Sequence, residues 1–254
     1  MQKSLYLVLF VALLTSRCTT IVFEKPIPAK ATLINKCPTS FVGQFVEEKS
    51  DETPHLLQEV ISFESPLGHQ WFVYEYKQIA EAELKDFPTF EVKNNVLLVE
   101  HIKVTLKDKE TSKDSTVETP VLRTKTGYQT TKRLAYSLDF KTKTIIQYPE
   151  PKDNDEKTGT FDMRQKGDTY YLNIKGLENN DYWYVILLTP KGDELTINML
   201  SQIKEEKEEE VNAIMPLTKL DDDTYLAKPT DEQLEAFIKH PEAGEVTVYK
   251  RIKY

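Results

Sequence analysis

The chain has 254 residues, of which 39% are hydrophobic and 29% are charged, and its formal net charge is −8. This composition is too apolar for a disordered chain. The 41 acidic residues against 33 basic ones argue against a nucleic-acid-binding protein, because phosphate binding needs a clustered basic surface. We therefore expect a soluble folded domain with no nucleic-acid partner.

The N-terminal residues predict an exported protein. Residues 5–14 form an uninterrupted apolar run behind the positive charge of Lys3. Such a run is too short to span a bilayer core of about 30 Å as a helix, but it suits the apolar region of a signal peptide. We predict a signal peptide over residues 1–18. The alternative is a buried N-terminal strand or helix.

Cys18 follows this run at the place where a cleavage region belongs. Together with Thr15 and Ser16 it resembles the lipobox of bacterial lipoproteins, although Arg17 stands where that motif has a small residue. The resemblance implies that Cys18 is diacylated and anchors the protein in a membrane, on the periplasmic side or at the cell surface. The alternative is a periplasmic or secreted protein in which Cys18 is removed with the signal peptide or pairs with Cys37.

Two regions follow Cys18. Residues 19–39 contain three prolines and little periodicity, which predicts a tether or N-terminal arm. Residues 40–254 are dominated by short strand-like runs between turn residues, so we predict one β-rich domain there. The predicted strands cover residues 40–46, 60–63, 70–76, 96–106, 129–140, 144–148, 160–164, 169–175, 182–189, 194–200 and 245–252.

Residues 159–200 carry the clearest strand pattern. Four runs are joined by short turns rich in Gly, Asp and Pro, which is typical of a meander of antiparallel hairpins. The run at 182–189 is apolar at both sets of alternate positions. This connectivity predicts a single antiparallel up-and-down β-barrel of about eight to ten strands.

Two helices interrupt the predicted strands. Residues 203–213 contain a run of Lys and Glu that suits an exposed helix. The second, C-terminal helix begins at Thr230 as N-cap, with Gln233 at the capping-box position. It places Leu234, Phe237 and Ile238 on one apolar stripe.

Several short segments resemble lipocalin-like proteins. Residues 41–45, Phe-Val-Gly-Gln-Phe, resemble the Gly-x-aromatic first strand of lipocalin-like barrels. The closing order of strand, helix from Thr230 and final strand is similar to small lipocalin-like lipoproteins of bacteria. The Tyr-Trp strand and Gly-Asp turn within residues 182–199 are similar to the same group. The resemblance implies a calycin-like barrel that can enclose an apolar cavity, and it transfers no site residue.

The sequence carries no recognisable catalytic motif. It has no Gly-rich phosphate loop, no serine-hydrolase elbow and no Cys/His spacing for zinc. The run Asp221-Asp222-Asp223 lacks the spaced ligands of a calcium loop. We therefore expect no metal and no cofactor, and we favour a non-catalytic function over an envelope hydrolase.

Aromatic residues alternate along several predicted strands. In a barrel one alternate set faces inward, where it either lines a ligand pocket or fills the core. We predict Trp71, Val73, Tyr170 and Trp183 as ligand-binding residues. Two functions remain open: a binding module for a small apolar ligand, or an interaction lipoprotein with a filled barrel that contacts another envelope protein.

Overall fold

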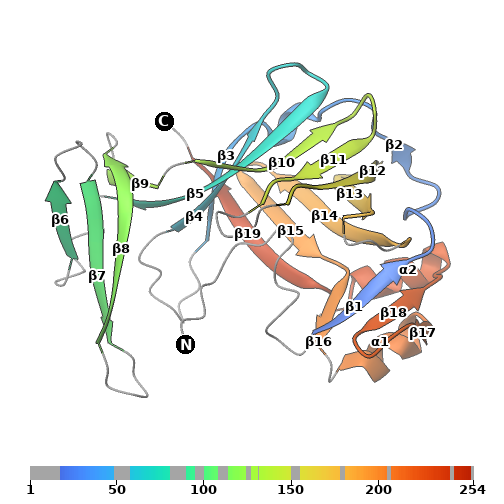
Figure 1. Ribbon diagram of the computed structural model, residues 1–254. Coiled ribbons are helices and arrows are strands. Elements are labelled where there is room, and N and C mark those ends of the chain that lie inside the picture. The colour runs from blue at the N-terminus through green and yellow to red at the C-terminus, as the bar shows by residue number, and fades with distance from the viewer. Residues whose placement is uncertain are drawn as a thin grey trace.

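The computed structural model describes residues 18–48, 58–80, 90–94, 100–107, 114–123, 127–130, 132–149, 155–177, 181–204, 207–240 and 243–252. The predicted signal peptide, up to residue 17, lies outside these described residues. The chain folds as a mainly β protein, and its described part contains two α-helices (Figure 1).

Ten antiparallel strands form a closed barrel, which confirms the predicted fold class. The ring closes because β19 pairs with β15 on one side and with β3 on the other. In ring order the strands are β3 (Gly43–Glu47), β4 (Gln58–Glu64), β5 (Gln70–Ala80), β10 (Arg133–Asp139), β11 (Thr144–Gln147), β12 (Lys157–Lys166), β13 (Thr169–Lys175), β14 (Trp183–Lys191), β15 (Glu194–Met199) and β19 (Glu245–Arg251).

Two tight hairpins lie in the part of the barrel that shows the clearest sequence pattern. The pairs Lys166–Thr169 and Lys191–Glu194 close turns of two residues each, and each turn begins with a glycine. Gly167 has a φ of 60° and Gly192 a φ of 62°. Two-residue hairpins need positive φ at their first central position, because only such turns match the twist of the strands. The sequence thereby sets the register of β12 to β15.

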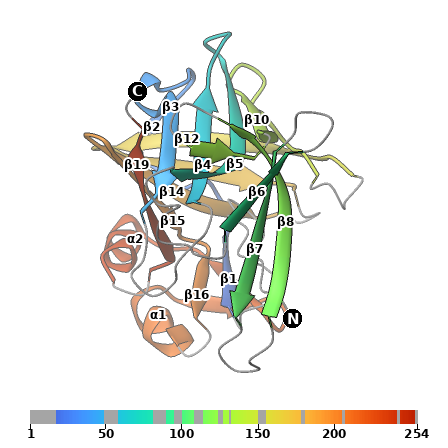
Figure 2. The same cartoon turned by 90° about the vertical axis from the view of Figure 1, so that its left-hand side faces the viewer.

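A first insertion separates β5 from β10. Its strands are β6 (Phe90–Asn94), β7 (Glu100–Lys107), β8 (Asp114–Arg123) and β9 (Gly127–Gln129). β6, β7 and β8 pair with one another as an antiparallel sheet, and β9 joins this sheet to β5. The sheet projects from one side of the barrel (Figures 1 and 2).

A second insertion separates β15 from β19 and forms a layer outside the barrel, called the outer layer below. Its elements are β16 (Gln202–Lys204), α1 (Glu208–Ile214), β17 (Leu217–Lys219), β18 (Thr224–Ala227) and α2 (Asp231–Ile238). β1 (Cys18–Phe23) completes it, parallel to β18 and antiparallel to β16. The layer covers the outward side chains Tyr171, Val185 and Leu187 of β13 and β14. This explains why residues 182–189 are apolar at both sets of alternate positions.

The N-terminal arm predicted at residues 19–39 needs correction. Ile21, Val22 and Phe23 of β1 are fully buried, so this segment begins inside the core. Its partners lie far along the chain: Thr19 hydrogen-bonds Glu208, 189 positions away. The rest of the segment contains β2 (Thr32–Leu33), which pairs with β12, and a short 3-10 helix (Thr39–Phe41).

The two predicted helices have different outcomes. The predicted helix at 203–213 is corrected, because Ile203 belongs to β16, where it pairs with Thr19, and α1 begins only at Glu208. α2 agrees with its prediction: Thr230 is the N-cap, and it exchanges both capping-box hydrogen bonds with Gln233.

Replacing Thr230 by Ala is expected to destabilise the protein by about 1 kcal/mol, the usual cost of losing an N-cap side chain. Urea unfolding followed by circular dichroism measures this change. Thr142→Ala, in the exposed turn between β10 and β11, is the control and should change stability by less than about 0.5 kcal/mol. Equal stability of the two variants would show that the capping box does not hold α2 in place.

Candidate functional site

The interior of the barrel is filled with side chains. A single buried cluster, drawn from all ten strands and from Phe41, occupies it. The void left at its centre is about 10 Å³, and it is lined by Trp71 and Val73 of β5 together with side chains of β4, β10, β11, β13 and β14. A cavity needs about 10–15 Å³ to hold one water molecule. This void therefore has room for one water molecule at most.

Aromatic rings make up one end of this interior. Trp71 is 1% exposed, and its ring centroid lies 5.2 Å from that of Phe41 and 5.2 Å from that of Phe140, both nearly edge-on. Such edge-to-face pairs contribute about 0.5–1.5 kcal/mol beyond the area they bury. The indole Nε1 of Trp71 is buried without a hydrogen-bond acceptor among the described residues. Burial of an unpaired donor costs about 1–3 kcal/mol, so this atom is a polar mismatch in the aromatic end.

The structure does not bring the four predicted ligand-binding residues into one cavity. Trp71 and Val73 face the interior, and Tyr170 packs against the same cluster while half-buried. Trp183 instead packs against the outer-layer cluster, with Lys175 Nζ 6.0 Å from its ring centroid. The reason is alternation: Ile186 and Leu188 of β14 point inward, so Trp183, at an odd position, points outward with Val185.

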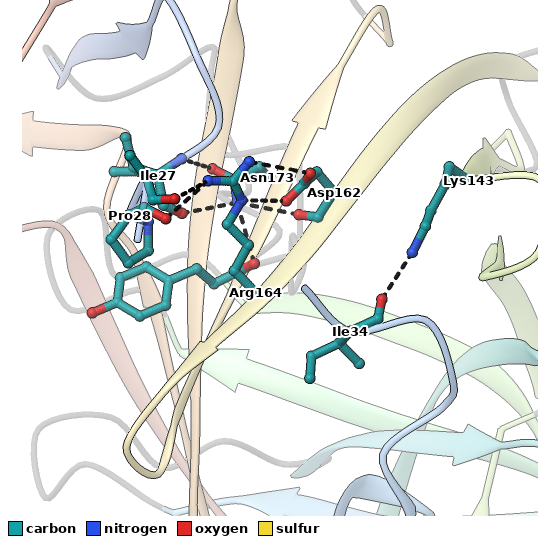
Figure 3. A network of polar contacts seen from close by, with 9 residues as sticks. Ile27, Pro28, Ile34, Lys143, Asp162, Arg164 and Asn173 are labelled. Carbon is teal, nitrogen blue, oxygen red and sulfur yellow. Dashed lines mark hydrogen bonds and ion pairs between the residues drawn. The ribbon is translucent and has the colours of Figure 1, made fainter. Parts of the chain in front are cut away.

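The segment between β1 and β3, residues 24–42, is called the strap below. It runs along the outside of β12 and β13, where polar side chains bind its backbone (Figure 3). The N–H of Ile27 donates to Asn173 Oδ1 (2.8 Å), and Asn173 Nδ2 donates back to the Ile27 carbonyl (3.0 Å). Arg164 Nη1 donates to the Pro28 carbonyl (2.9 Å), while its Nε donates to Asp162 (2.7 Å), which orients the guanidinium.

Two cationic side chains hold the remainder of the strap. Lys143 Nζ donates to the Ile34 carbonyl at 2.8 Å (Figure 3), and burial lowers the pKa of this ammonium group. Arg251 of β19 donates to the carbonyls of Ser40 (2.6 Å) and Val42 (2.7 Å). The Lys143 contact satisfies a half-buried backbone carbonyl, while the two Arg251 contacts tie exposed carbonyls of the strap to β19. The strap is therefore fixed to the barrel mainly by side chains.

The strap carries Phe41 into the aromatic end of the barrel. Phe41 is fully buried, and its ring centroid lies 4.9 Å from that of Tyr170 and 6.2 Å from that of Phe63. The Phe41 ring that fills this end of the barrel therefore belongs to a connecting segment and not to a barrel strand. Phe41, Asn173 and Arg164 are not among the predicted site residues, although Phe41 lies in the Gly-x-aromatic segment. The visible signal was Asn173, a lone amide in the otherwise apolar run of β13.

The two cysteines lie in different parts of the fold. Cys18, the predicted lipidation site, is the first residue of β1, opposite Lys204 in the register. Cys37 lies in the strap, half-buried, as a free thiol. The alternative disulfide between them is therefore not formed.

Cys37 is expected to react slowly with alkylating reagents, because burial raises the pKa of its thiol and only the thiolate is nucleophilic. At pH 8, iodoacetamide should modify it several-fold more slowly in the folded protein than in urea. Peptide mass mapping separates its signal from that of Cys18. Equal rates in both states would show that the strap leaves this thiol open to solvent.

Within the described ranges, no three His, Cys, Asp or Glu side chains are grouped so that they could hold a metal ion.

None of the helices in the described part of the chain has the length and apolar character needed to cross a membrane.

A comparison of the chain with protein-family models, with curated proteins and with solved structures finds no significant match.

Proposed function

We propose that this chain is an exported, non-catalytic protein of the cell envelope that is held at a membrane by an acyl group on Cys18. Its barrel serves as a filled, rigid support, and it acts through surface contacts with another envelope protein. The filled interior carries this proposal: the central void of about 10 Å³ compares with roughly 300–1,000 Å³ for ordinary ligand pockets.

The position of Cys18 in a paired strand is compatible with acylation. β1 pairs with β16 and β18. Thr19 of β1 donates a hydrogen bond to Glu208, which follows it by 189 positions. A chain exported from its N-terminus therefore exposes Cys18 before these partners have left the ribosome or crossed the membrane. Acylation precedes formation of β1 in this order of events.

The sheet of β6, β7 and β8 is the expected contact surface for the partner protein. It stands apart from the barrel core (Figures 1 and 2), so its formation is not needed to close the barrel. Its register aligns Phe90, Val104 and Val117 across the three strands, and Glu91, Lys103 and Glu118 at the next positions. One face of the sheet thus carries apolar positions and the other carries charges of both signs.

Photo-crosslinking in intact cells tests this function. A photoreactive amino acid at position 104 in β7 should give one adduct of defined mass, while the same group at position 67, in the turn between β4 and β5, should give none. The same samples, analysed by native mass spectrometry, should show the barrel without a bound small molecule. Equal adduct patterns at the two positions would contradict the proposed contact surface.

A second candidate function is the binding of a small apolar ligand in the barrel. Two observations favour it: Phe41 occupies the aromatic end as part of the strap, and Trp71 Nε1 lacks an acceptor that a ligand could supply. The chain has two tryptophans, so Trp183→Phe leaves Trp71 as the only indole reporter. Titration with decanoate should then change its emission saturably under this function, and should leave it unchanged if the barrel stays filled.

A further inference from the structure

The proposed anchor residue is joined to the fold without a spacer. Thr19 and Thr20 directly follow Cys18 and are 3% and 6% exposed. The Thr19 hydroxyl donates to the Glu208 carboxylate at the start of α1, and the Thr20 N–H donates to the Asp223 carbonyl at 2.7 Å. An acyl group on Cys18 would therefore hold the outer layer itself close to the bilayer.

The surface beside this point consists of two segments, residues 207–210 at the start of α1 and residues 219–223 around the turn between β17 and β18. We call it the anchor face. It contains six carboxylates against two lysine ammonium groups. One exposed apolar side chain, Leu220, stands among them, 40% exposed. Both segments lie on the side of the barrel where β1 and β16 begin the outer layer (Figure 1).

The charges of the anchor face lie within electrostatic range of the anchor. Cys18 and Thr20 are two positions apart in the strand, a length of about 7 Å. The Thr20 N–H is hydrogen-bonded to the backbone carbonyl of Asp223. The side chains of Asp221, Asp222 and Asp223 are all exposed. The Debye length at physiological ionic strength is about 8 Å, so lipid charge at the anchor is not fully screened from these carboxylates.

We propose that the anchor face rests on the lipid surface and that it fits a zwitterionic surface, from which anionic lipids displace it. This inference rests on the acyl anchor of the proposed function. Leu220 then lies at the level of the headgroups, because the chain between Cys18 and the fold has no slack to move it away. Anionic lipids repel the six carboxylates, because the membrane surface and the carboxylates then carry charge of the same sign. The turn between β4 and β5 lies at the opposite end of the barrel from β16 and the start of β1 (Figure 1), so it points away from the membrane in this orientation.

Quenching of tryptophan fluorescence by brominated phosphatidylcholine tests this orientation. The acylated protein, purified from an exporting bacterium, is reconstituted as two matched variants, Leu220→Trp on the anchor face and Leu67→Trp in the turn between β4 and β5. Leu67 is 60% exposed and Leu220 is 40% exposed, so both positions accept the larger ring. Quenching above that of the parent protein should be larger for Leu220→Trp than for Leu67→Trp, because bromine atoms on the acyl chains quench only indole rings that lie close to the bilayer.

Two further samples separate the causes. A Gly/Ser spacer of about 12 residues after Cys18, which spans roughly 20 Å, should remove the difference between the variants. Vesicles with about 30% phosphatidylglycerol should lower the Leu220→Trp quenching, and Asp221→Asn with Asp222→Asn should restore it.

The outcomes distinguish this inference from the proposed function. Equal quenching of Leu220→Trp and Leu67→Trp in a protein whose N-terminal mass shows acylation would overturn the orientation and leave the anchor intact. A purified protein whose N-terminal mass shows no acyl group would overturn both. Quenching of Leu220→Trp that does not respond to phosphatidylglycerol would refute the preference for a zwitterionic surface.

Discussion

Replacing Phe41 by Ala should lower the free energy of unfolding by about 3–5 kcal/mol, the usual cost of removing a buried aromatic ring. Phe41 is fully buried, and its ring packs edge-on against the rings of Trp71 and Tyr170. The cavity left by its ring adjoins side chains that also line the central void, among them Phe63 and Trp71. Urea unfolding followed by Trp fluorescence measures the loss.

The neighbouring residue provides the matched control for Phe41. Val42→Ala removes an apolar group from the same strap, but Val42 is 40% exposed, so its loss should cost less than about 0.5 kcal/mol. Benzene should partly restore the stability of Phe41→Ala, by about 1.4 kcal/mol at a concentration tenfold above its Kd. A loss below about 1 kcal/mol for Phe41→Ala would mean that the strap is peripheral to the core.

The barrel could be predicted from the sequence because its strands alternate and its turns are local. Residues 169–175 match β13 at both ends, and strand alternation puts Tyr170, Leu172 and Ile174 on one face, the face that packs into the barrel interior. The turns at Gly167 and Gly192 are set by two adjacent residues. Local signals of this kind fix the neighbours of each strand in a meander, and a meander of ten strands closes on itself.

The outer layer and the strap could not be predicted, because their contacts are not local. β1 is six residues long, and its partners in β18 lie about two hundred positions later. Where both alternate sets are apolar, as in β14, alternation does not decide which set points inward; Trp183 was assigned to the wrong side for this reason. The side chains that bind the strap, such as Arg164, resemble ordinary surface cations in the sequence.

The strap depends most on Asn173, and Asn173→Ala should cost about 3 kcal/mol of stability. Asn173 is fully buried and bonds both the N–H and the carbonyl of Ile27, which is itself 8% exposed. Its amide also donates to the carbonyls of Asp162 and Tyr171. Each buried backbone group left without a partner costs about 1–3 kcal/mol, and alanine leaves at least the two groups of Ile27 unpaired.

A second amide serves as the control, since Asn212 also bonds one backbone N–H, that of Leu217, but is exposed. Asn212→Ala should cost about 1 kcal/mol or less, because water replaces the lost partner.

In Asn173→Ala, trypsin should also cut the strap after Lys30 or Lys36 faster than in the parent protein, since the bonds to Ile27 no longer hold the strap against β13. Matching stability losses in the two variants, with unchanged cleavage of the strap, would show that Asn173 does not fasten it. The strap carries both Phe41 and the half-buried Cys37. Because Asn173→Ala loosens this segment, it should also raise the reactivity of the Cys37 thiol.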